Sequence, residues 1–423
     1  MMVHYRSWIN NDRTAARMTW ILALLWLTAA CQALTATCWW VSWYYQRRLK
    51  LEQLRLVPVT TWPADRPAPS LAVVIACHNE ENGIEDCIRR LQGQNYPNMQ
   101  IVVCNDRSTD RTGEILQRLP ADDPRIRVVN ITELPPGWTG KTHAVSVGVR
   151  ASTSDYILFM DSDVVLSPHA ILTVMDKVCR DDLDFFSFWP RLELRGRSEK
   201  LLTPAAMLLL SMWTKPYRSG KDIASKAIMG NGQFLLMKRR SYEAIGGHES
   251  VAAELAEDAI LAFKAHQAGQ RCWSGPGDGL YVTYREGDFS RTVNSLARVF
   301  IGSLRSHWRL WAGTQVLMGG AFAPGWILPT AAVCLAIGLD RTLCLTFLII
   351  ALVHWAGIVV SLRRAFAMTL IKRGSLIWFP YGAAVIVGVL IWSSYLLAGW
   401  GTLRWGKTRY RVKGSQITAV AGQ

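Results

Sequence analysis

The stretch Leu71-Ala-Val-Val-Ile-Ala-Cys-His-Asn-Glu80 decides how the middle of the chain folds. Its first six residues are apolar and three of them are β-branched, which predicts a strand that is buried on both faces. Similar short apolar runs follow at 101–104, 126–129 and 156–160, and an amphipathic helical pattern covers 84–91. Strands that alternate with helices in this way predict an α/β domain with a mostly parallel sheet.

Polar side chains follow three of these four strands, namely His78-Asn-Glu80, Asn105-Asp106 and Asp161-Ser-Asp163. Ligands of open α/β sheets bind beyond the carboxyl ends of the strands, so we expect a polar cleft there. Side chains repeat every second residue along a strand, which places Asp161 and Asp163 on one side of the chain. Such a pair suits Mg²⁺ or Mn²⁺ that also binds a substrate diphosphate. The alternative is an acidic cap for the helix expected from His169.

Several other chemistries are excluded by missing motifs. No GxGxxG follows the first strand, and GxxxxGK[ST], GxSxG and HExxH are absent from the chain. The string Gly137-Trp-Thr-Gly-Lys-Thr142 is too short for a phosphate loop and follows two prolines rather than a strand. The nine cysteines form no CxxC pair, so we expect reduced thiols that pack as small apolar side chains. Catalysis is therefore expected to depend on carboxylates.

Composition indicates a membrane protein of more than one structural unit. The chain has 423 residues, half of them apolar, with 19 Trp and a mean hydropathy of +0.12. Its net charge of +15 is compatible with anionic lipids, phosphate-bearing ligands or nucleic acid. The basic residues concentrate beside the apolar runs rather than along one stripe, which argues against nucleic acid.

Four runs without Asp, Glu, Lys or Arg are long enough to span a bilayer: 20–45, 310–339, 342–362 and 374–403. The first ends in an aromatic cluster and a basic flank, which predicts an uncleaved anchor rather than a secretory signal. The expected organisation is an N-terminal tail (1–17), the anchor (18–46), a linker (47–70), a cytoplasmic domain (71–309), about three C-terminal spans (310–403) and a basic tail (404–423).

Charge gives an orientation but leaves one conflict. The short basic loop 363–373 is expected in the cytoplasm, which places Asp340-Arg341 outside and residues 46–309 inside. The prediction is a multi-pass protein of the inner membrane. If all three C-terminal runs crossed the membrane, however, the basic tail would lie outside, although basic segments are expected in the cytoplasm. A re-entrant segment would remove the conflict, and helices could break at Pro324, Gly325 and Pro329 or at Pro380 and Gly382.

Residues 71–309 resemble the family 2 inverting glycosyltransferases, which have the nucleotide-diphospho-sugar transferase fold (GT-A type) with a mixed, mostly parallel sheet. The matching strings are Val74-Ile-Ala-Cys-His-Asn-Glu-Glu81, Asn105-Asp-Arg-Ser-Thr-Asp110, Asp161-Ser-Asp163, Gly230-Asn-Gly-Gln-Phe234, Ile245-Gly-Gly-His248 and Ala256-Glu-Asp258. Leu134-Pro-Pro-Gly-Trp-Thr-Gly-Lys141 resembles the membrane-bound branch that glycosylates lipids, which includes carotenoid- and hopanoid-associated and ceramide glucosyltransferases.

On the donor side, the resemblance implies that Glu80 and Asp106 contact uridine or ribose. Asp163, with Asp161 beside it, would hold Mg²⁺ or Mn²⁺. Lys141 would bind the diphosphate. The ordinary alternative for Glu80 and Asp106 is that they cap the helices that follow them.

The resemblance makes Asp258 the catalytic base, in the first turn of a helix expected over 253–266. Glu257 and His248 would face the acceptor. Arg298 is a second cationic candidate for the diphosphate. The alternatives are acids that stabilise a helix dipole at Glu257 and Asp258, a solvated loop histidine at His248, and an interfacial helix over 293–310 that includes Arg298.

Two departures from the family pattern matter. Asn105 stands where the family usually has an acid, so only Asp106 is carried over. Processive synthases and ceramide glucosyltransferases carry a Q/RxxRW string about forty residues after the catalytic aspartate, where this chain has Ser295-Leu-Ala-Arg-Val299. Arg404-Trp405 comes too late in the chain to complete that string.

The leading prediction is transfer of one sugar from a nucleotide-diphospho-sugar, expected to be a UDP-hexose, to a lipid hydroxyl at the cytoplasmic face of the membrane. The expected partners are the nucleotide sugar, the lipid acceptor and the membrane, without nucleic acid. The alternatives are a processive polysaccharide synthase and a non-catalytic membrane scaffold. The apolar run 201–213 is too short to span, and is either a buried helix or a membrane-facing helix beside the acceptor entrance.

Overall fold

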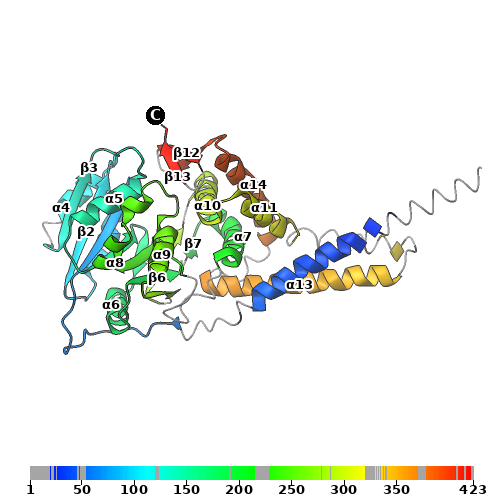
Figure 1. Cartoon of the computed structure of the whole chain (residues 1–423), viewed down its shortest axis with the longest axis horizontal. Coiled ribbons are helices and arrows are strands. Elements are labelled where there is room, and N and C mark those ends of the chain that lie inside the picture. Colours follow the sequence, from blue (N-terminus) through cyan, green and yellow to red (C-terminus); the bar gives the residue numbers. More distant parts are fainter. Residues whose placement is uncertain are drawn as a thin grey trace, which may run out of the picture.

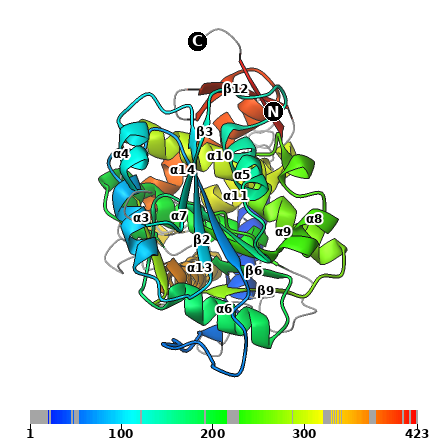
Figure 2. The same cartoon turned by 90° about the vertical axis from the view of Figure 1, so that its left-hand side faces the viewer.

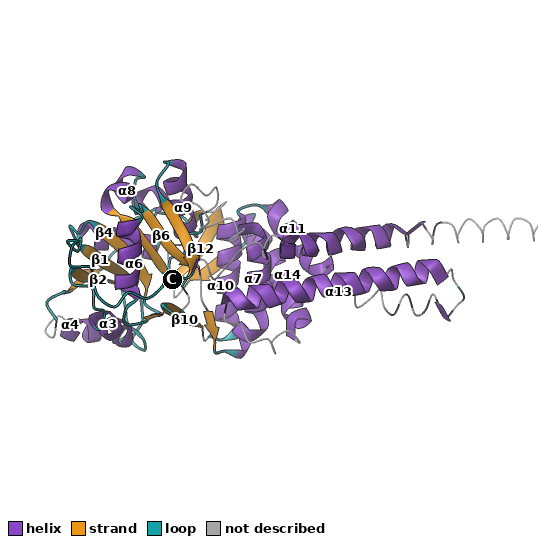
Figure 3. Cartoon of the chain, turned by 90° about the horizontal axis from the view of Figure 1, so that it is seen from below, coloured by secondary structure: helices purple, strands orange, loops and turns teal. Residues whose placement is uncertain are grey.

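The chain is a sheet domain at one end, a helical layer beside it, and a pair of long helices that extends away from both (Figures 1 and 3). The computed structural model describes residues 20, 23–24, 26–44, 47, 54–119, 123–189, 192–214, 228–277, 279–285, 287–319, single residues between 329 and 338, 341–369, 378–405, 408–413 and 416–420.

The sheet domain contains a seven-stranded sheet in the order β3-β2-β1-β4-β8-β6-β9. β8 pairs antiparallel with both of its neighbours, and the other pairs are parallel. This confirms the predicted mixed, mostly parallel sheet. The strands are β1 (Leu71–Cys77), β2 (Met99–Asp106), β3 (Ile126–Ile131), β4 (Tyr156–Asp161), β6 (Phe185–Trp189), β8 (Phe234–Lys238) and β9 (Cys272–Pro276). All four strands predicted from the sequence are present, each slightly longer than its apolar run.

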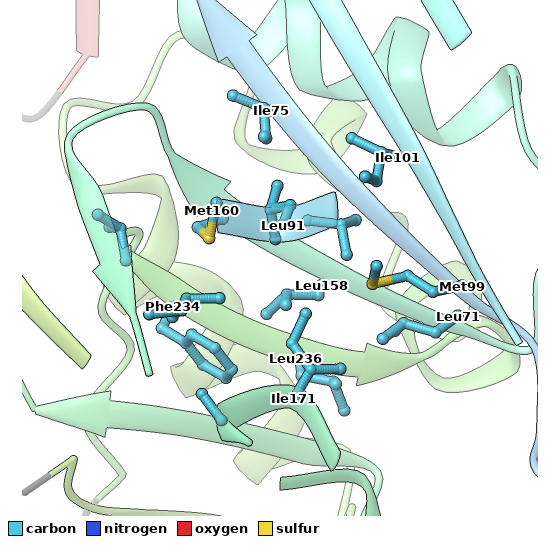
Figure 4. Packing of buried hydrophobic residues seen from close by; sticks show 14 of the residues in the cluster. Leu71, Ile75, Leu91, Met99, Ile101, Leu158, Met160, Ile171, Phe234 and Leu236 are labelled. Atoms are coloured by element: carbon cyan, nitrogen blue, oxygen red, sulfur yellow. The ribbon is translucent and has the colours of Figure 1, made fainter. Parts of the chain in front are cut away.

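Helices cover both faces of this sheet, because alternate residues of each central strand point to opposite sides. Leu71, Val73 and Ile75 pack with the first group of helices, and Ala72 and Val74 pack with the second. The first group is α3 (Ile84–Gln92), α4 (Thr112–Arg118) and α6 (Ala170–Arg180), and the second is α5 (Gly140–Arg150), α8 (Arg239–Ala244) and α9 (Glu257–Gln267). Figure 2 shows the two groups on either side of the sheet, and Figure 4 shows the first core.

A second, smaller sheet lies next to the end of β4. It has the order β5-β10-β7, with β5 (Val164–Leu166), β7 (Leu192–Leu194) and β10 (Tyr281–Arg285). β5 begins directly after Asp163, so the segment between β4 and β5 is a short turn fixed by strand pairing at both ends. Of the two acidic residues predicted to bind metal, Asp161 ends β4 and Asp163 lies in this turn.

The helical layer has its own apolar core. It is formed by α7 (Arg197–Thr214), α10 (Phe289–Leu304), α11 (His307–Leu317) and α14 (Phe379–Leu397). The apolar run 201–213 lies within α7, and Leu202, Leu208 and Leu209 are fully buried, so the buried-helix interpretation holds for these side chains. The stretch predicted as one amphipathic segment over 293–310 is two helices, because the chain turns at Arg305, whose φ is +56°.

Residues predicted as a basic tail form a third sheet, with β11 (Thr402–Trp405), β12 (Thr408–Lys413) and β13 (Gln416–Ala419). Its buried side chains, Leu403, Tyr410, Val412 and Ile417, belong to the core of the helical layer. The C-terminal end of the described chain therefore lies beside the sheet domain, as Figure 1 shows.

The long helix α13 (Arg341–Thr369) runs beside the helix formed by residues 26–44 (Figures 1 and 3). Trp40 Nε1 donates to the carbonyl of Val353, and His354 Nδ1 lies 2.7 Å from Gln32 Oε1. In the described part of the chain, two helices are long and apolar enough to cross a membrane, Cys344–Arg363 and Phe379–Leu397. Of the predicted run 310–339, the structure describes α11 and single later residues, while Pro324 and Gly325 lie outside the described residues.

Candidate active site

The carboxyl ends of β1, β2 and β4 lie at one edge of the large sheet, because these strands are parallel neighbours. A small pocket opens above β4. Its polar lining is Lys141, Asp161, His248, Glu257 and Asp258, and its apolar lining includes Ala76, Val145, Phe159 and Leu235. Five of the predicted site residues, drawn from four separate parts of the sequence, therefore share one pocket.

Lys141 is at the centre of this pocket. Its Nζ lies 2.9 Å from Asp161 Oδ1 and 3.0 Å from Glu257 Oε1. Burial would lower the pKa of Lys141, but the negative charges of Asp161, Glu257 and Asp258 raise it above its usual value. The ammonium is therefore charged at neutral pH and connects the end of β4 to the start of α9.

The position of Lys141 follows from the N-terminus of α5. Thr139 is the N-cap, and its hydroxyl accepts a hydrogen bond from the Thr142 N–H. In turn, the Thr142 hydroxyl accepts a hydrogen bond from the Thr139 N–H. This is a capping box. Lys141 is the second residue of the helix, so its backbone is fixed where its side chain enters the pocket.

Asp258 is held by two backbone donors. Its Oδ2 accepts from the Gly232 N–H at 2.6 Å and its Oδ1 from the Ala259 N–H at 2.7 Å. Burial and the neighbouring charge of Glu257 raise the pKa of Asp258 to about 6, although Lys141 opposes the rise. A carboxylate of this kind is ionised at neutral pH and is basic enough to accept a proton.

The start of α9 differs from the prediction. The expected helix over 253–266 begins instead at Glu257, because the carbonyls of Ala252 and Ala253 accept hydrogen bonds from Thr139 and Ile417. Asp258 is nevertheless in the first turn, as predicted. Gly230 lies so close to α9 that a Cβ there would be 2.1 Å from the Asp258 carbonyl oxygen. The matching string Gly230-Asn-Gly-Gln-Phe234 therefore packs directly against the start of α9 beside Asp258.

A second acidic group lies next to the pocket. Burial and then the charge of Asp163 raise the pKa of Glu80 to about 7, with a further contribution from Asp161 and an opposing one from Arg291. Glu80 therefore lies close to the Asp161-Ser162-Asp163 turn. Arg291, at the start of α10, was not predicted, and no local sequence pattern marks it.

These carboxylates fit a divalent metal that is completed by its substrate. In the described ranges, no three His, Cys, Asp or Glu side chains are grouped closely enough to hold a metal ion by themselves. Magnesium is commonly bound by one or two carboxylates plus substrate phosphates and water. Asp163 is exposed at the turn, and the pKa of Glu80 is raised by burial and then by the charges of Asp163 and Asp161, whose contribution a divalent cation would relieve. The donor set is chemically suitable.

Asp106 is engaged with its neighbour. Arg107 Nε and Nη2 donate to the two carboxylate oxygens of Asp106, at 2.7 and 2.8 Å. Asn105, where the family usually has an acid, instead donates from Nδ2 to Asn130 Oδ1 on β3. The predicted nucleotide contact of Asp106 therefore requires Arg107 to move or to bind the nucleotide together with it.

His248 lies on the pocket wall rather than in solvent. It is 3% exposed, and its Nδ1 lies 2.9 Å from the Tyr242 hydroxyl. Burial, assisted by the charge of Lys141, lowers the pKa of His248 to about 3, so the ring is neutral. The interpretation as a solvated loop histidine is wrong.

Arg298 is not among the residues that line the pocket. Its guanidinium lies 4.2 Å from the ring centre of Trp405 on β11. The arginine and the tryptophan that are separated by more than a hundred residues in the sequence are thus in contact in the fold. The local sequence around Arg298 or Trp405 does not predict this pair, because the contact forms only when the C-terminal sheet packs beside α10.

Residues 72–246 match the family model described as Glycosyl transferase family 2. The match covers the strands and the turn that carry Glu80, Asp106, Lys141, Asp161 and Asp163. The matched residues 72–246 thus form a region similar to glycosyl transferase family 2 domains.

Three curated relatives are similar to this chain. The succinoglycan biosynthesis protein ExoO of Rhizobium meliloti is 26% identical over 55% of this chain and 65% of its own length. The 4,4'-diaponeurosporenoate glycosyltransferase of Staphylococcus haemolyticus is 25% identical over 48% and 52%. The poly-beta-1,6-N-acetyl-D-glucosamine synthase of Staphylococcus aureus is 24% identical over 48% and 49%. The match spans less than two thirds of the length of each relative.

Solved structures are similar at lower identity. The mannosyltransferase PcManGT from Pyrobaculum calidifontis, solved in complex with GDP-Man and Mn²⁺, is 18% identical with a TM-score of 0.48, over 78% of this chain and 98% of that one. Residues 1–349 of TarS from S. aureus, solved in complex with UDP-GlcNAc, are 13% identical with a TM-score of 0.38, over 82% and 99%.

Proposed function

We propose that this protein is an inverting glycosyltransferase that moves a single sugar from a nucleotide-diphospho-sugar, a UDP-hexose, to a hydroxyl group of a membrane lipid. The observation that carries the proposal is the pocket in which Asp258, with its pKa raised to about 6, lies beside the charged Lys141 at the strand ends of a family 2 domain. One group can accept a proton and the other can stabilise a phosphate. The named carotenoid-related relative supports a lipid acceptor.

In the proposed reaction, Asp258 removes the proton of the acceptor hydroxyl while that oxygen attacks the anomeric carbon. The bond between this carbon and the diphosphate oxygen breaks, and the nucleoside diphosphate leaves with the bonding electron pair. Lys141 stabilises the negative charge of the diphosphate. The two backbone donors that hold Asp258 fix the direction of its carboxylate before the acceptor binds.

Asp163, Asp161 and Glu80 are the residues that would hold Mg²⁺ or Mn²⁺, which when bound neutralises charge on the diphosphate. Lys141 is then expected to exchange its contact with Asp161 for a phosphate oxygen. Glu257 keeps its contact with Lys141 and faces the acceptor side together with His248.

The test of this function is product analysis. The full chain, purified in detergent, is incubated with radiolabelled UDP-glucose, UDP-galactose, UDP-N-acetylglucosamine or GDP-mannose, together with a bacterial lipid extract and Mn²⁺. Label that moves into the organic phase as one sugar per lipid supports the proposal. Label that stays entirely in the nucleotide sugar with every donor contradicts it.

A processive polysaccharide synthase is the second candidate. It is favoured by the contact between Arg298 and Trp405, the two residue types that end the Q/RxxRW string of such enzymes. The named poly-N-acetylglucosamine synthase relative points the same way. The same incubation separates the two candidates, because a synthase yields label of high molecular mass in the aqueous phase.

For the arrangement in the membrane, we propose that α14 lies on the cytoplasmic side and does not cross. The C-terminal sheet hydrogen-bonds to the sheet domain, so residues 309 and 402 are on the same side of the membrane and an even number of crossings connects them. α14 packs against α7, α10 and α11, which adjoin the sheet domain. α13 also contacts α7, with Ile358 and Leu362 in the same core, but the rest of this helix extends away from the sheet domain. α13 and a segment of the run 310–339 then form the pair of crossings.

This arrangement removes the conflict in the charge rule, since the basic residues of the C-terminal sheet stay in the cytoplasm. Single cysteines introduced at Arg409 and at Asp340 in a background without native cysteines provide the test. In inside-out vesicles a membrane-impermeant maleimide should label the first and not the second. Labelling of both from the same side contradicts the arrangement.

A further inference from the structure

The C-terminal sheet contacts the sheet domain at two defined places. One side of this sheet is apolar and buried on the helical layer, while Arg404, Arg409, Arg411 and Lys413 are exposed on the other. Both contacts involve residues that adjoin the candidate active site in sequence and in space.

The first contact is with the loop 252–256, which leads directly into α9. The Ile417 N–H donates to the Ala253 carbonyl at 2.9 Å, and Glu254 pairs with Gln416 in an isolated antiparallel bridge. The other side of this loop contacts the start of α5, because the Ala252 carbonyl accepts from the Thr139 N–H at 2.9 Å and from the Thr142 hydroxyl at 2.6 Å. The loop is therefore fixed between β13 and α5.

The second contact is with α5 itself. Burial raises the pKa of the Tyr410 hydroxyl and the backbone N–H of Gly140 opposes the rise, which places the 4% exposed Tyr410 side chain at the N-terminus of α5. Gly140 is the first residue of α5, and the first N–H groups of a helix have no partner within the helix. The Tyr410 hydroxyl lies beside the first of these N–H groups. Lys141 is the next residue.

Close packing leaves α5 little room to shift at this point. A Cβ at Gly140 would be only 2.5 Å from Asp106 Oδ2 and 2.9 Å from Arg107 Nη2. The start of α5 is thus fixed between the Asp106–Arg107 pair and Tyr410. A change at Tyr410 would be transmitted directly to the backbone that carries Lys141.

We infer that the C-terminal sheet is part of the catalytic unit: it fixes α5, which carries Lys141, against the loop 252–256 that leads into Glu257 and Asp258 of α9, with the Ile417 N–H and the Tyr410 hydroxyl as positioning groups. Its effect on turnover rests on the proposed function. Its effect on the two backbone segments does not.

The first experiment substitutes Tyr410→Phe in the full chain, which removes one oxygen and keeps the buried ring. Turnover is expected to fall about fivefold and the Kd for UDP to rise, with the Tm close to that of the unmodified protein, because a displaced Lys141 binds the diphosphate less well. Tyr395→Phe on α14, which also loses one phenolic hydroxyl, is the matched control. Equal turnover for Tyr410→Phe and Tyr395→Phe would overturn the inference.

The second experiment needs no substrate. Ile417→Pro removes the N–H that reaches Ala253, and Ile417→Val shortens the same side chain but keeps the N–H. Hydrogen exchange in segments 139–142 and 252–258 is expected to be at least tenfold faster in the proline variant and unchanged in the valine variant. If the proline variant does not fold, the exchange of segment 139–142 in Tyr410→Phe decides in its place.

The two experiments separate the inference from the proposed function. If the unmodified protein transfers no sugar while exchange in both segments rises as expected, the proposed function fails and the positioning by the sheet stands. If neither Tyr410→Phe nor a folded Ile417→Pro changes exchange in these segments, the inference fails whatever the activity.

Discussion

Two polar clusters join parts of this chain that are distant in sequence, and they differ in composition. The pocket cluster, made of Lys141, Asp161, Glu257 and Asp258, consists of charged groups on three elements of the sheet domain. The helix pair cluster, Gln32 and His354, joins two long helices through a single contact of 2.7 Å in apolar surroundings. Under the proposed function the first cluster serves the reaction, and we expect the second to serve helix association.

The two clusters also differ in what their loss would leave behind. Removing one charge from the pocket cluster shifts the pKa of the others, because they interact at short range. Removing one partner of the helix pair leaves one neutral polar group without its partner between apolar helices. Changes in the pocket should therefore alter turnover with little effect on folding, and changes in the helix pair should do the opposite.

The largest effect is expected for Asp258→Asn. Loss of a general base typically reduces the rate by roughly 10²–10⁴-fold, and the amide should still accept the Gly232 N–H, so UDP binding and Tm should persist. Initial rates and UDP titrations measure the two quantities. Asp86→Asn on the exposed face of α3 is the control, since its partner is the nearby Arg90 at the surface. Turnover of Asp258→Asn within tenfold of the unmodified protein would remove Asp258 from this role.

Metal removal should have the next largest effect. EDTA is expected to abolish transfer and Mn²⁺ or Mg²⁺ to restore it. Without the cation, the negative charge of the diphosphate would face the carboxylates of Glu80, Asp161 and Asp163. Asp163→Ala should weaken nucleotide binding in the presence of metal and leave metal-free binding unchanged. Isothermal titration with and without Mn²⁺ measures this. Full activity in the presence of EDTA would contradict a role for Asp161 and Asp163 in binding a metal for the reaction.

The pH dependence should report on Lys141. Asp258 must be ionised to act as a base, so turnover should fall as pH decreases through its pKa of about 6. Lys141 lowers that pKa, so Lys141→Met should move the acid limb of the pH profile to higher pH, whereas Lys141→Arg should keep it nearer its original place. Glu80, with a pKa of about 7, titrates in the same range. A profile of Glu80→Gln that retains the limb near pH 6 assigns it to Asp258. An unshifted limb in Lys141→Met would contradict the coupling.

The smallest effect on turnover is expected for the helix pair. His354→Leu should lower stability by about 1 kcal/mol, as loss of one interhelical hydrogen bond does, and should leave kcat within twofold of the unmodified protein. The double variant Gln32→Leu with His354→Leu should recover part of that loss, because no polar group is then left without a partner. Thermal unfolding in detergent measures both. A large fall in kcat with unchanged Tm would instead give this pair a role in the reaction.

The central fold could be predicted because its signals are local. Apolar runs of β-branched residues gave β1 and β2, and polar residues at their carboxyl ends marked the edge where the pocket lies. The acidic pair at 161 and 163 followed from the same logic. Lys141 was identified from the string 134–141. It lies in the pocket because the capping box at Thr139 fixes the first turn of α5.

The remaining features depend on contacts between distant parts of the chain. Nothing near Asp106 indicates that Arg107 takes both of its oxygens, and nothing near Arg298 indicates Trp405. Hydropathy could not separate α13 from α14 either, because both are apolar and long enough to span. Their packing partners distinguish them, and packing partners are set by the whole fold.

The most direct test of the account is a structure of Asp258→Asn, determined in lipid nanodiscs with Mn²⁺ and an intact UDP-hexose. The account predicts that the metal lies against Asp163, that Lys141 has left Asp161 for a phosphate oxygen, and that residue 258 faces the anomeric carbon from the side opposite the diphosphate. A nucleotide bound outside the pocket, or a sugar that turns its anomeric carbon away from residue 258, would contradict it.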